Sequence, residues 1–368
     1  MSAVASDTRV ALQRLDVHAC TIPTDEPESD GTAEWDSTTI VIVEAHAGDA
    51  TGIGYTYCEP AAAELVRSKL ADVVDGADVM DVRAAWLSMG AAVRNAGRPG
   101  IAFCAISAVD QALWDLKARL VGLSLVDLLG AAHDGVPIYG SGGFCSYSLD
   151  RLQEQLGGWA ADGIPRVKMK LGREPERDPK RLDAAREAIG GDVELFVDAN
   201  GAFTSKVALG WAERYALEWN VTWLEEPVSS ADFDGLRLLH ERGPGGLEIA
   251  AGEYAYVPAD FRNLIGCVDC LQADVTRAGG ITGLLGAAGL ASAHQLDVSA
   301  HCAPAISAHA FCAVERRRHL EYFHDHVRIE HMLFDGVPEP DGGVLRPDRS
   351  RPGNGLELKR QEVERWSA

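Results

Sequence analysis

From about residue 137 the chain repeats one pattern of hydrophobic and polar positions. A short apolar run is followed by a polar loop and then by an Ala- and Leu-rich segment whose apolar residues recur at helical spacing. Eight such runs predict strands: VPIYGSGG, RVKMKLG, VELFVDANG, VTWLEEP, LEIAAGE, CLQADVT, LDVSAHC and HLEYFH. Because these strands alternate with helices, the pattern favours an α/β fold with a closed parallel barrel.

The segment before the repeats has a different pattern. Residues 8–60 contain three strand-like runs interrupted by the polar stretch TIPTDEPESDGTAEWDS, which is long enough to predict a functional loop. Several helical patterns follow up to residue 130. We therefore predict an α+β domain over residues 1–132, a barrel over residues 133–325, and a Pro- and Gly-rich tail, 326–368, that packs back on the first domain.

Charge and cysteine content narrow the function classes. The 368 residues carry a formal net charge of −21, which argues against nucleic acid and anionic membranes as partners. No apolar run is long enough for a signal peptide core or a membrane span, so a cytoplasmic location is expected. The eight cysteines are scattered and are expected to be reduced thiols, including the single CxxC of Cys267 and Cys270.

The last polar residue of each barrel strand after the first falls at an equivalent place, about one βα unit after the previous one. These residues are Lys170, Asp198, Glu225, Glu253, Asp274, His301 and Glu321. Active sites of such barrels form at the C-terminal ends of the strands. The spacing therefore predicts that all seven side chains converge on one mouth of the barrel.

Three of these residues predict a metal site. Asp198, Glu225 and Glu253 come from three adjacent strands and offer hard oxygen ligands, which suit one Mg²⁺ per subunit rather than Zn²⁺. A single carboxylate at a loop start is more often structural. Three carboxylates at one barrel end favour the metal.

The KMK stretch predicts a base. Lys168 and Lys170 share one face of a strand whose other face, Val167, Met169 and Leu171, is apolar, so both lysines are expected to point into the barrel. Two close ammonium groups depress each other's pKa, which lets one of them act as a base. The alternative is a structural pair of salt-bridged lysines.

Across the mouth, Asp274 and His301 lie on neighbouring strands, where the carboxylate can orient the imidazole and raise its basicity. Glu321 can donate a hydrogen bond if burial raises its pKa. A metal flanked by a lysine and a histidine predicts an enzyme that abstracts a proton next to a carboxylate, with Mg²⁺ and Glu321 stabilising the enediolate. The expected partner is a small-molecule carboxylate.

These motifs resemble those of the enolase superfamily, and of its mandelate racemase subgroup in particular. The matching stretches are KMK, VDANG, WLEEP, AAGE, QADVTRAGGIT, SAHCAP and LEYF, together with SAVDQALWDLKARLVGLSLVDLLG and PGNGLEL outside the barrel. The resemblance implies a capping domain over a (β/α)7β modified TIM barrel and Mg²⁺ held by Asp198, Glu253 and the first glutamate of WLEEP. It also implies bases at Lys170 and His301, contact of Lys168 with the substrate carboxylate, and a homo-oligomer, either a dimer or an octamer.

The resemblance further implies a hydro-lyase that dehydrates a sugar acid to a 2-keto-3-deoxy acid. Racemisation or epimerisation of a hydroxy acid and lactone cycloisomerisation are the alternatives, and a non-catalytic metabolite-binding relative is the alternative from another class. Residues 21–37 and 52–60 correspond to the loops that set specificity, and the acidity of the first disfavours a second substrate carboxylate. His324 and His326 lie near the last strand and could reach the pocket, but we expect solvated loop histidines. The predicted substrate-binding residues are Lys168, Asn200, Trp35 and Glu321.

Overall fold

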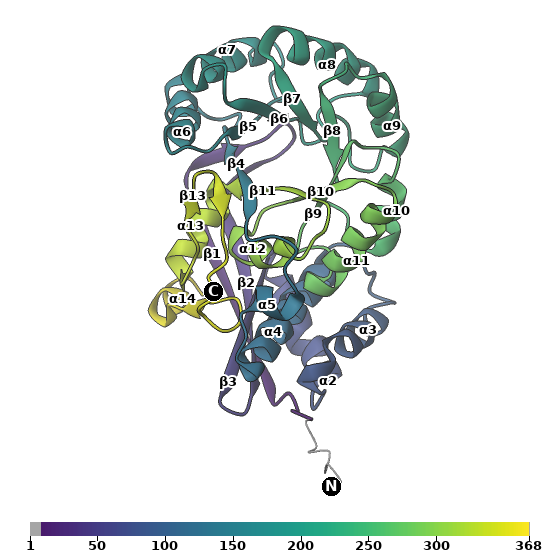
Figure 1. The fold of residues 1–368 in the computed structure, drawn as a ribbon, viewed down its shortest axis with the longest axis vertical. Helices are drawn as coiled ribbons and strands as arrows, with labels where there is room; N and C mark the ends of the chain where they lie inside the picture. The colour runs from purple at the N-terminus through teal and green to yellow at the C-terminus, as the bar shows by residue number, and fades with distance from the viewer. Residues whose placement is uncertain (1–8, 368) are drawn as a thin grey trace.

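The computed structural model describes residues 9–367, which form a parallel barrel with a smaller layer of strands and helices beneath it (Figure 1). Hydrogen bonds between the last barrel strand and the first close the sheet into a ring. The structure therefore confirms the predicted eight-stranded barrel. Its strands are β4 (Val136–Gly142), β5 (Arg166–Lys170), β6 (Glu194–Asp198), β7 (Val221–Glu225), β8 (Glu248–Ala251), β9 (Cys270–Ala273), β10 (Asp297–Ala300) and β11 (Arg317–Phe323).

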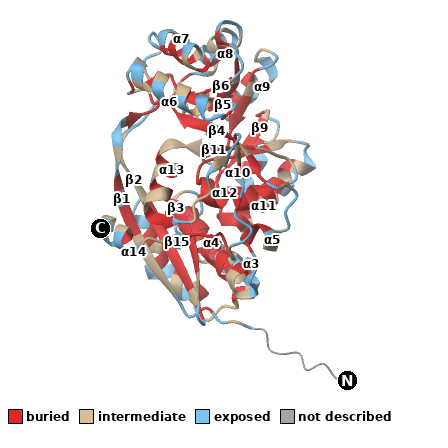
Figure 2. Ribbon diagram, turned by 60° about the vertical axis from the view of Figure 1, so that its left-hand side comes forward, coloured by how far each residue is buried: buried red, intermediate tan, exposed pale blue. Residues whose placement is uncertain are grey.

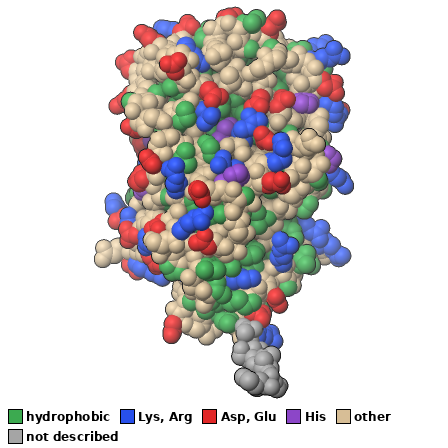
Figure 3. Space-filling model, viewed as in Figure 1, with side chains coloured by type: hydrophobic (Ala, Val, Ile, Leu, Met, Phe, Trp, Pro, Cys, Tyr) green, Lys and Arg blue, Asp and Glu red, His purple; other side chains and the backbone are tan. Residues whose placement is uncertain are grey.

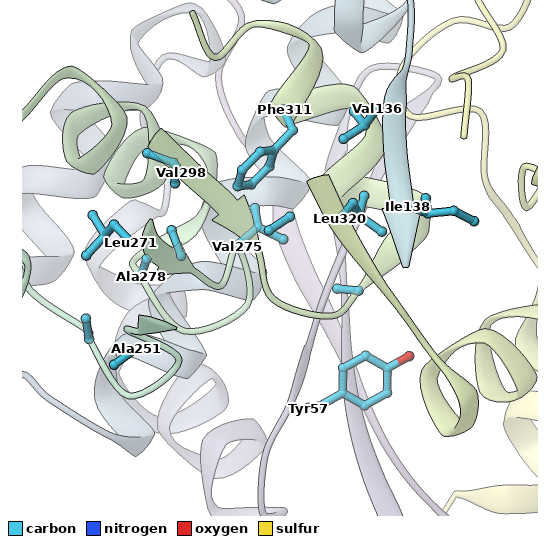
Figure 4. Close-up of a cluster of buried hydrophobic side chains, with 14 of the residues drawn as sticks. Tyr57, Val136, Ile138, Ala251, Leu271, Val275, Ala278, Val298, Phe311 and Leu320 are labelled. Atoms are coloured by element: carbon cyan, nitrogen blue, oxygen red, sulfur yellow. The ribbon is translucent and has the colours of Figure 1, made fainter. Parts of the chain in front are cut away.

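A helix follows each of the first seven barrel strands and covers the outside of the ring. These helices are α6 (Leu149–Ala161), α7 (Asp178–Ile189), α8 (Ser205–Trp219), α9 (Phe233–Arg242), α10 (Pro258–Leu264), α11 (Gly280–Ala293) and α12 (Pro304–Cys312). The strands between them are buried (Figure 2). Their outward apolar residues, such as Val298 and Leu320, form one core with helix residues such as Phe311 of α12 (Figure 4).

Large apolar side chains fill the lower half of the barrel interior. Tyr139, Phe196, Trp223, Ala250 and Cys270 form a buried cluster, in which the rings of Phe196 and Trp223 stack with centroids 5.3 Å apart. Side chains alternate along a strand, so the inward residue that follows Phe196 is Asp198 and the one that follows Trp223 is Glu225. The apolar plug therefore lies directly next to the carboxyl side chains at the C-terminal mouth of these two strands.

The N-terminal layer is an antiparallel sheet covered by helices. The sheet contains β1 (Arg14–Ser29), β2 (Glu34–Ala47) and β3 (Ala50–Tyr57), and α4 (Ile101–Val121) crosses it. The shorter helical segments are α1 (Ala61–Leu65), η1 (Val66–Leu70), α2 (Ala71–Val74), η2 (Val79–Asp81), α3 (Val82–Ala92) and α5 (Leu125–Leu129).

The polar stretch of residues 21–37, which we expected to be a loop, instead extends the β1–β2 hairpin. Ile22 pairs with Thr38 and Pro23 with Ser37, and the register shifts between Pro23 and Glu28 before pairing resumes. Proline and charged residues disfavour strands, but a long β2 partner holds this segment in register. At the tip, the Thr32 hydroxyl donates to the carbonyl of Asn200 (3.1 Å), so the hairpin rests on the barrel mouth.

The segment after the barrel begins with α13 (His324–Leu333) and ends with α14 (Arg360–Trp366), which packs on β1. Between them, the short strands β12 (Phe334–Asp335) and β15 (Glu357–Leu358) pair with each other, while β13 (Pro340–Asp341) pairs with β14 (Val344–Leu345), which also pairs with β4. Arg360 forms an ion pair with the buried Glu44 of β2 (2.5 Å). Within residues 9–367, no helix has both the length and the apolarity needed to cross a membrane.

Close approach of α4 to β3 supplies a stability test. A Cβ atom on Gly54 would lie 2.2 Å from the carbonyl oxygen of Ala108, a distance that requires the helix to move. We expect Gly54→Ala to lower the free energy of unfolding by about 2 kcal/mol or more, measured by urea denaturation. Gly210→Ala is the control: Gly210 lies in α8 with open space around it, so alanine should stabilise by about 0.5–1 kcal/mol. Equal effects of the two changes would contradict this packing.

Candidate active site

The C-terminal mouth of the barrel collects the polar side chains predicted from the strand ends. Parallel pairing places Lys170 beside Asp198 and Asp198 beside Glu225. All of the predicted groups are buried: Lys168, Lys170, Asp198, Glu225, Glu253, Asp274, His301 and Glu321. They come together because parallel strands end at the same edge of the sheet.

Three carboxylates form a group of the size that a cation needs. One oxygen each from Asp198, Glu225 and Glu253 lies within 4.8 Å of the other two. Neighbouring donors fix two of the side chains: the backbone N–H of Asn200 donates to Asp198 Oδ1 (2.9 Å), and the indole N–H of Trp223 donates to Glu225 Oε2 (2.9 Å). Buried hard oxygen donors fit Mg²⁺. We describe these three residues below as the carboxylate triad.

The two lysines are enclosed by carboxylates. Lys168 Nζ lies 2.5 Å from Glu225, 2.7 Å from Glu321 and 3.3 Å from Asp198, and Lys170 Nζ lies 2.6 Å from Asp198. Burial lowers the pKa of each lysine, but the carboxylates outweigh burial and raise both. Lys168 does lower the pKa of Lys170, as expected for two close ammonium groups, but Asp198 outweighs Lys168 and the net pKa of Lys170 is raised.

Asp274 and His301 form the predicted pair. Asp274 Oδ2 lies 2.7 Å from His301 Nδ1, and the backbone N–H and hydroxyl of Thr276 donate to the other oxygen of Asp274 at 2.6 and 2.7 Å. His301 Nε2 lies 3.0 Å from Glu253 Oε2. Burial lowers the pKa of His301, but nearby Cys302, Glu253, Glu321 and the Asp274 hydrogen bond outweigh burial, so the net pKa is raised above its ordinary value.

Glu321 differs from the prediction. Burial raises its pKa, but Lys168 and His301 outweigh burial, and the net pKa lies below the ordinary value. The Ser141 hydroxyl also donates to Glu321 Oε1 (2.6 Å). Glu321 is therefore a carboxylate that accepts hydrogen bonds, and the expectation of a protonated donor is wrong here. Its neighbours on β4 and β5 decide this, and they are distant in the sequence.

A cavity of about 550 Å³ lies over the mouth, between the barrel and the β1–β2 hairpin. Trp35 and Asn200, two of the residues that we predicted to bind substrate, line it together with Lys170, His301 and Glu321; their contact with substrate stays a prediction. Lys168 is fully buried and is not among the lining residues, so the structure places it beneath the cavity floor. On the face shown in Figure 3, acidic and basic side chains are interspersed despite the negative net charge.

Several lining residues were not predicted from the sequence. His326 is buried against Tyr57, with ring centroids 3.4 Å apart, and burial lowers its pKa to about 3. The expectation of a solvated His326 is therefore wrong, whereas His324 is partly exposed and pairs with Asp25 at 2.8 Å. Cys302 also lines the cavity, and its position directly after His301 was the available signal.

Comparison with known proteins agrees with this architecture. Residues 20–130 match the family model of the mandelate racemase / muconate lactonizing enzyme N-terminal domain, and residues 151–363 match the enolase C-terminal domain-like model. The chain is 33% identical over 353 residues to the 3,6-anhydro-α-L-galactonate cycloisomerase of Streptomyces coelicolor. The aligned region covers 94% of this chain and 96% of the relative.

Two further proteins show the likeness in structure. The L-talarate/galactarate dehydratase of Salmonella typhimurium is 31% identical (89% of this chain, 82% of the relative), and its crystal structure liganded with Mg and L-lyxarohydroxamate has a TM-score of 0.90 over 100% of this chain and 95% of that chain. A mandelate racemase/muconate lactonizing enzyme-like protein of Rubrobacter xylanophilus is 62% identical, with a TM-score of 0.96 over 97% of this chain and 100% of that chain.

The two adjacent glutamates after Trp223 provide a test of the metal ligands. Glu225 belongs to the carboxylate triad, whereas Glu226 does not. Burial raises the pKa of both side chains, that of Glu225 to about 8 and that of Glu226 well above its ordinary value, so membership of the triad is what separates them. We expect Glu225→Gln to weaken Mg²⁺ binding about tenfold or more, measured by isothermal titration calorimetry. Glu226→Gln makes the same change at a side chain outside the triad and should retain binding. The opposite ranking would contradict the assignment.

Proposed function

Because the chain belongs to the mandelate racemase / muconate lactonizing enzyme family, we propose that it is a Mg²⁺-dependent hydro-lyase that removes the proton α to a carboxylate and dehydrates a sugar acid. One observation carries the proposal. Lys170 of β5 and His301, directly after β10, face one cavity beside the carboxylate triad, and these two strands are not neighbours in the barrel. A substrate seated between them would have a proton-transfer group on each side.

Lys170 is the proposed base. When bound, Mg²⁺ supplies positive charge that offsets the triad carboxylates and the charge that develops on the substrate carboxylate. Asp198 is the neighbour that holds the pKa of Lys170 high, while Lys168 lowers it. With the charge of Asp198 offset, Lys168 becomes the dominant neighbour, and Lys170 can take the α-proton as a neutral amine.

His301 is the proposed acid. Its raised pKa keeps the imidazole protonated, and Asp274 fixes Nδ1, so Nε2 is the nitrogen available to the substrate. As Lys170 Nζ takes the proton from C2, the C3–O bond breaks and the His301 Nε2 proton leaves with the hydroxyl as water. The resulting enol takes up a proton at C3 to give a 2-keto-3-deoxy acid.

The cavity lining favours a polyhydroxylated monoacid over a diacid. Among the described lining residues, the only ammonium and guanidinium groups belong to Lys170 and Arg277, and carboxylates already surround both. Thr21, Ser37, Thr38 and Thr39 contribute hydroxyl groups, and Asp30 and Glu59 contribute carboxylates. A second substrate carboxylate would meet like charge there, whereas sugar hydroxyls would find hydrogen-bonding partners.

Cycloisomerisation is the second candidate, favoured by the likeness to the S. coelicolor enzyme. If the substrate carries a ring oxygen at C3 in place of a hydroxyl, the same α-proton abstraction expels that oxygen and opens the ring. The product would then have the mass of the substrate, whereas dehydration removes the mass of one water. Mass spectrometry of the product separates the two reactions. A non-catalytic binding relative is disfavoured, because binding alone needs no proton donor and acceptor across the cavity.

Screening the protein with Mg²⁺ against mono- and diacid sugars tests the proposal. We expect a monoacid to give a product that reacts with a carbonyl reagent, and its α-hydrogen to exchange in deuterated water. Lys170→Ala combined with His301→Asn should abolish both signals. The matched control is Lys206→Ala with His294→Asn, two exposed positions outside the cavity. Exchange that survives in the first double variant would refute the two proposed proton-transfer roles.

Asp274→Asn tests the charged imidazole separately. Loss of the carboxylate should lower the rate by about 10²–10⁴-fold and lower the pKa of His301. An acid must be protonated to act, so the rate should begin to fall at a lower pH in the variant than in the parent, measured as a pH–rate profile. Asp269→Asn is the control, because Asp269 contacts His240 in the same manner (3.0 Å) outside the cavity. An unchanged profile in Asp274→Asn would exclude His301 as the acid.

A further inference from the structure

Three side chains beside the carboxylate triad form a second cluster of a different chemical kind. We propose that His301, Cys302 and Glu321 form a binding site for a thiophilic divalent cation such as Zn²⁺, and that this site is distinct from the Mg²⁺ site. Cys302 Sγ lies 3.4 Å from His301 Nε2 and 3.3 Å from Glu321 Oε2. His301 Nε2 lies 3.4 Å from Glu321 Oε2.

These separations match the edges of a tetrahedral zinc site. Zinc bonds of about 2.0 Å to nitrogen and oxygen and about 2.3 Å to sulfur place tetrahedral ligand atoms about 3.3 to 3.6 Å apart. The observed triangle, 3.3 to 3.4 Å on each side, therefore needs little rearrangement to hold the ion. All three residues line the cavity, so the fourth coordination position opens to water.

The cluster is also held in place by its surroundings. Asp274 binds His301 Nδ1 at 2.7 Å, which directs Nε2 to the ion and provides the carboxylate–histidine arrangement common at zinc sites. The Ser307 hydroxyl donates to the Cys302 carbonyl (2.8 Å), and Cys302 has a φ of 51°. On binding, the Cys302 thiol and the imidazolium release protons to solvent. The 3.0 Å contact between His301 Nε2 and Glu253 gives way to the metal bond.

Ligand softness separates the two sites. The carboxylate triad offers only hard oxygen atoms, which suit Mg²⁺, whereas thiolate and imidazole ligands select zinc and similar ions. Excess Mg²⁺ therefore does not displace zinc from the His301–Cys302–Glu321 cluster. Zinc in this position occupies His301 Nε2 and blocks the nitrogen that faces the substrate, so the site is inhibitory.

Cobalt(II) provides a direct probe, because a Co²⁺–thiolate bond gives a near-ultraviolet charge-transfer band and tetrahedral Co²⁺ gives intense visible bands. With purified protein in excess Mg²⁺, we expect one Co²⁺ per chain with both signatures, displaced by one equivalent of Zn²⁺. Cys302→Ser should lose the charge-transfer band and weaken zinc binding about tenfold or more. Glu321→Gln retains the thiol and should keep the band while zinc binding weakens by a similar factor.

Cys58→Ser is the matched control. Cys58 also lines the cavity and is hydrogen-bonded to Cys104, so this pair is the rival source of a thiolate signal. The proposal predicts that the band survives in Cys58→Ser. Loss of the band there, its persistence in Cys302→Ser, or its removal by Mg²⁺ would each overturn the proposal. Thermal unfolding checks that each variant is folded. No substrate is needed, so the outcome is independent of the proposed dehydration.

Discussion

The site depends on the mutual compensation of charges that are buried at one end of a barrel. The buried carboxylates there are Asp198, Glu225, Glu253, Asp274 and Glu321. An isolated buried carboxylate is strongly unfavourable and becomes stable only with paired charge and hydrogen bonds. Lys168 supplies much of that pairing, because its ammonium group contacts three carboxylates from β6, β7 and β11. The same pairing raises the pKa of both lysines, so the pKa of Lys170, the proposed base, depends on the charge state of the triad.

The barrel separates stability from chemistry along its axis. The aromatic plug around Phe196 and Trp223 fills the lower interior, while the next inward residues on the same strands, Asp198 and Glu225, carry carboxyl groups. A period of two residues in a strand is enough to place an apolar layer under a charged one. The apolar core thus lies on one side of the charged layer. The β1–β2 hairpin covers the other side, at the C-terminal mouth, and its tip contacts the backbone of Asn200.

The cavity between the hairpin and the barrel brings two groups of metal-ligating side chains next to each other. Oxygen ligands gather on β6, β7 and the segment after β8, whereas the imidazole and the thiol follow β10 and lie next to Glu321 of β11. His301 touches both groups, since Nε2 is near Glu253 and near Cys302. A cation bound to the second group would therefore act directly on the proposed proton donor.

The sequence alone was enough to predict the barrel and the set of side chains that meet at its mouth. The alternation of apolar strands with helical segments specified the barrel, and the spacing of polar strand ends specified which side chains meet, because both are local periodicities. Contacts between residues far apart in the sequence could not be predicted from these local periodicities. The β1–β2 hairpin extends through a segment with poor strand propensity because its partner strand and the barrel mouth hold it. The protonation of Lys170 and Glu321, the burial of His326 and the contacts of Cys302 depend on neighbours from distant strands. Only the tertiary structure decides these features, because electrostatic and packing energies depend on distances in space rather than on separation along the chain.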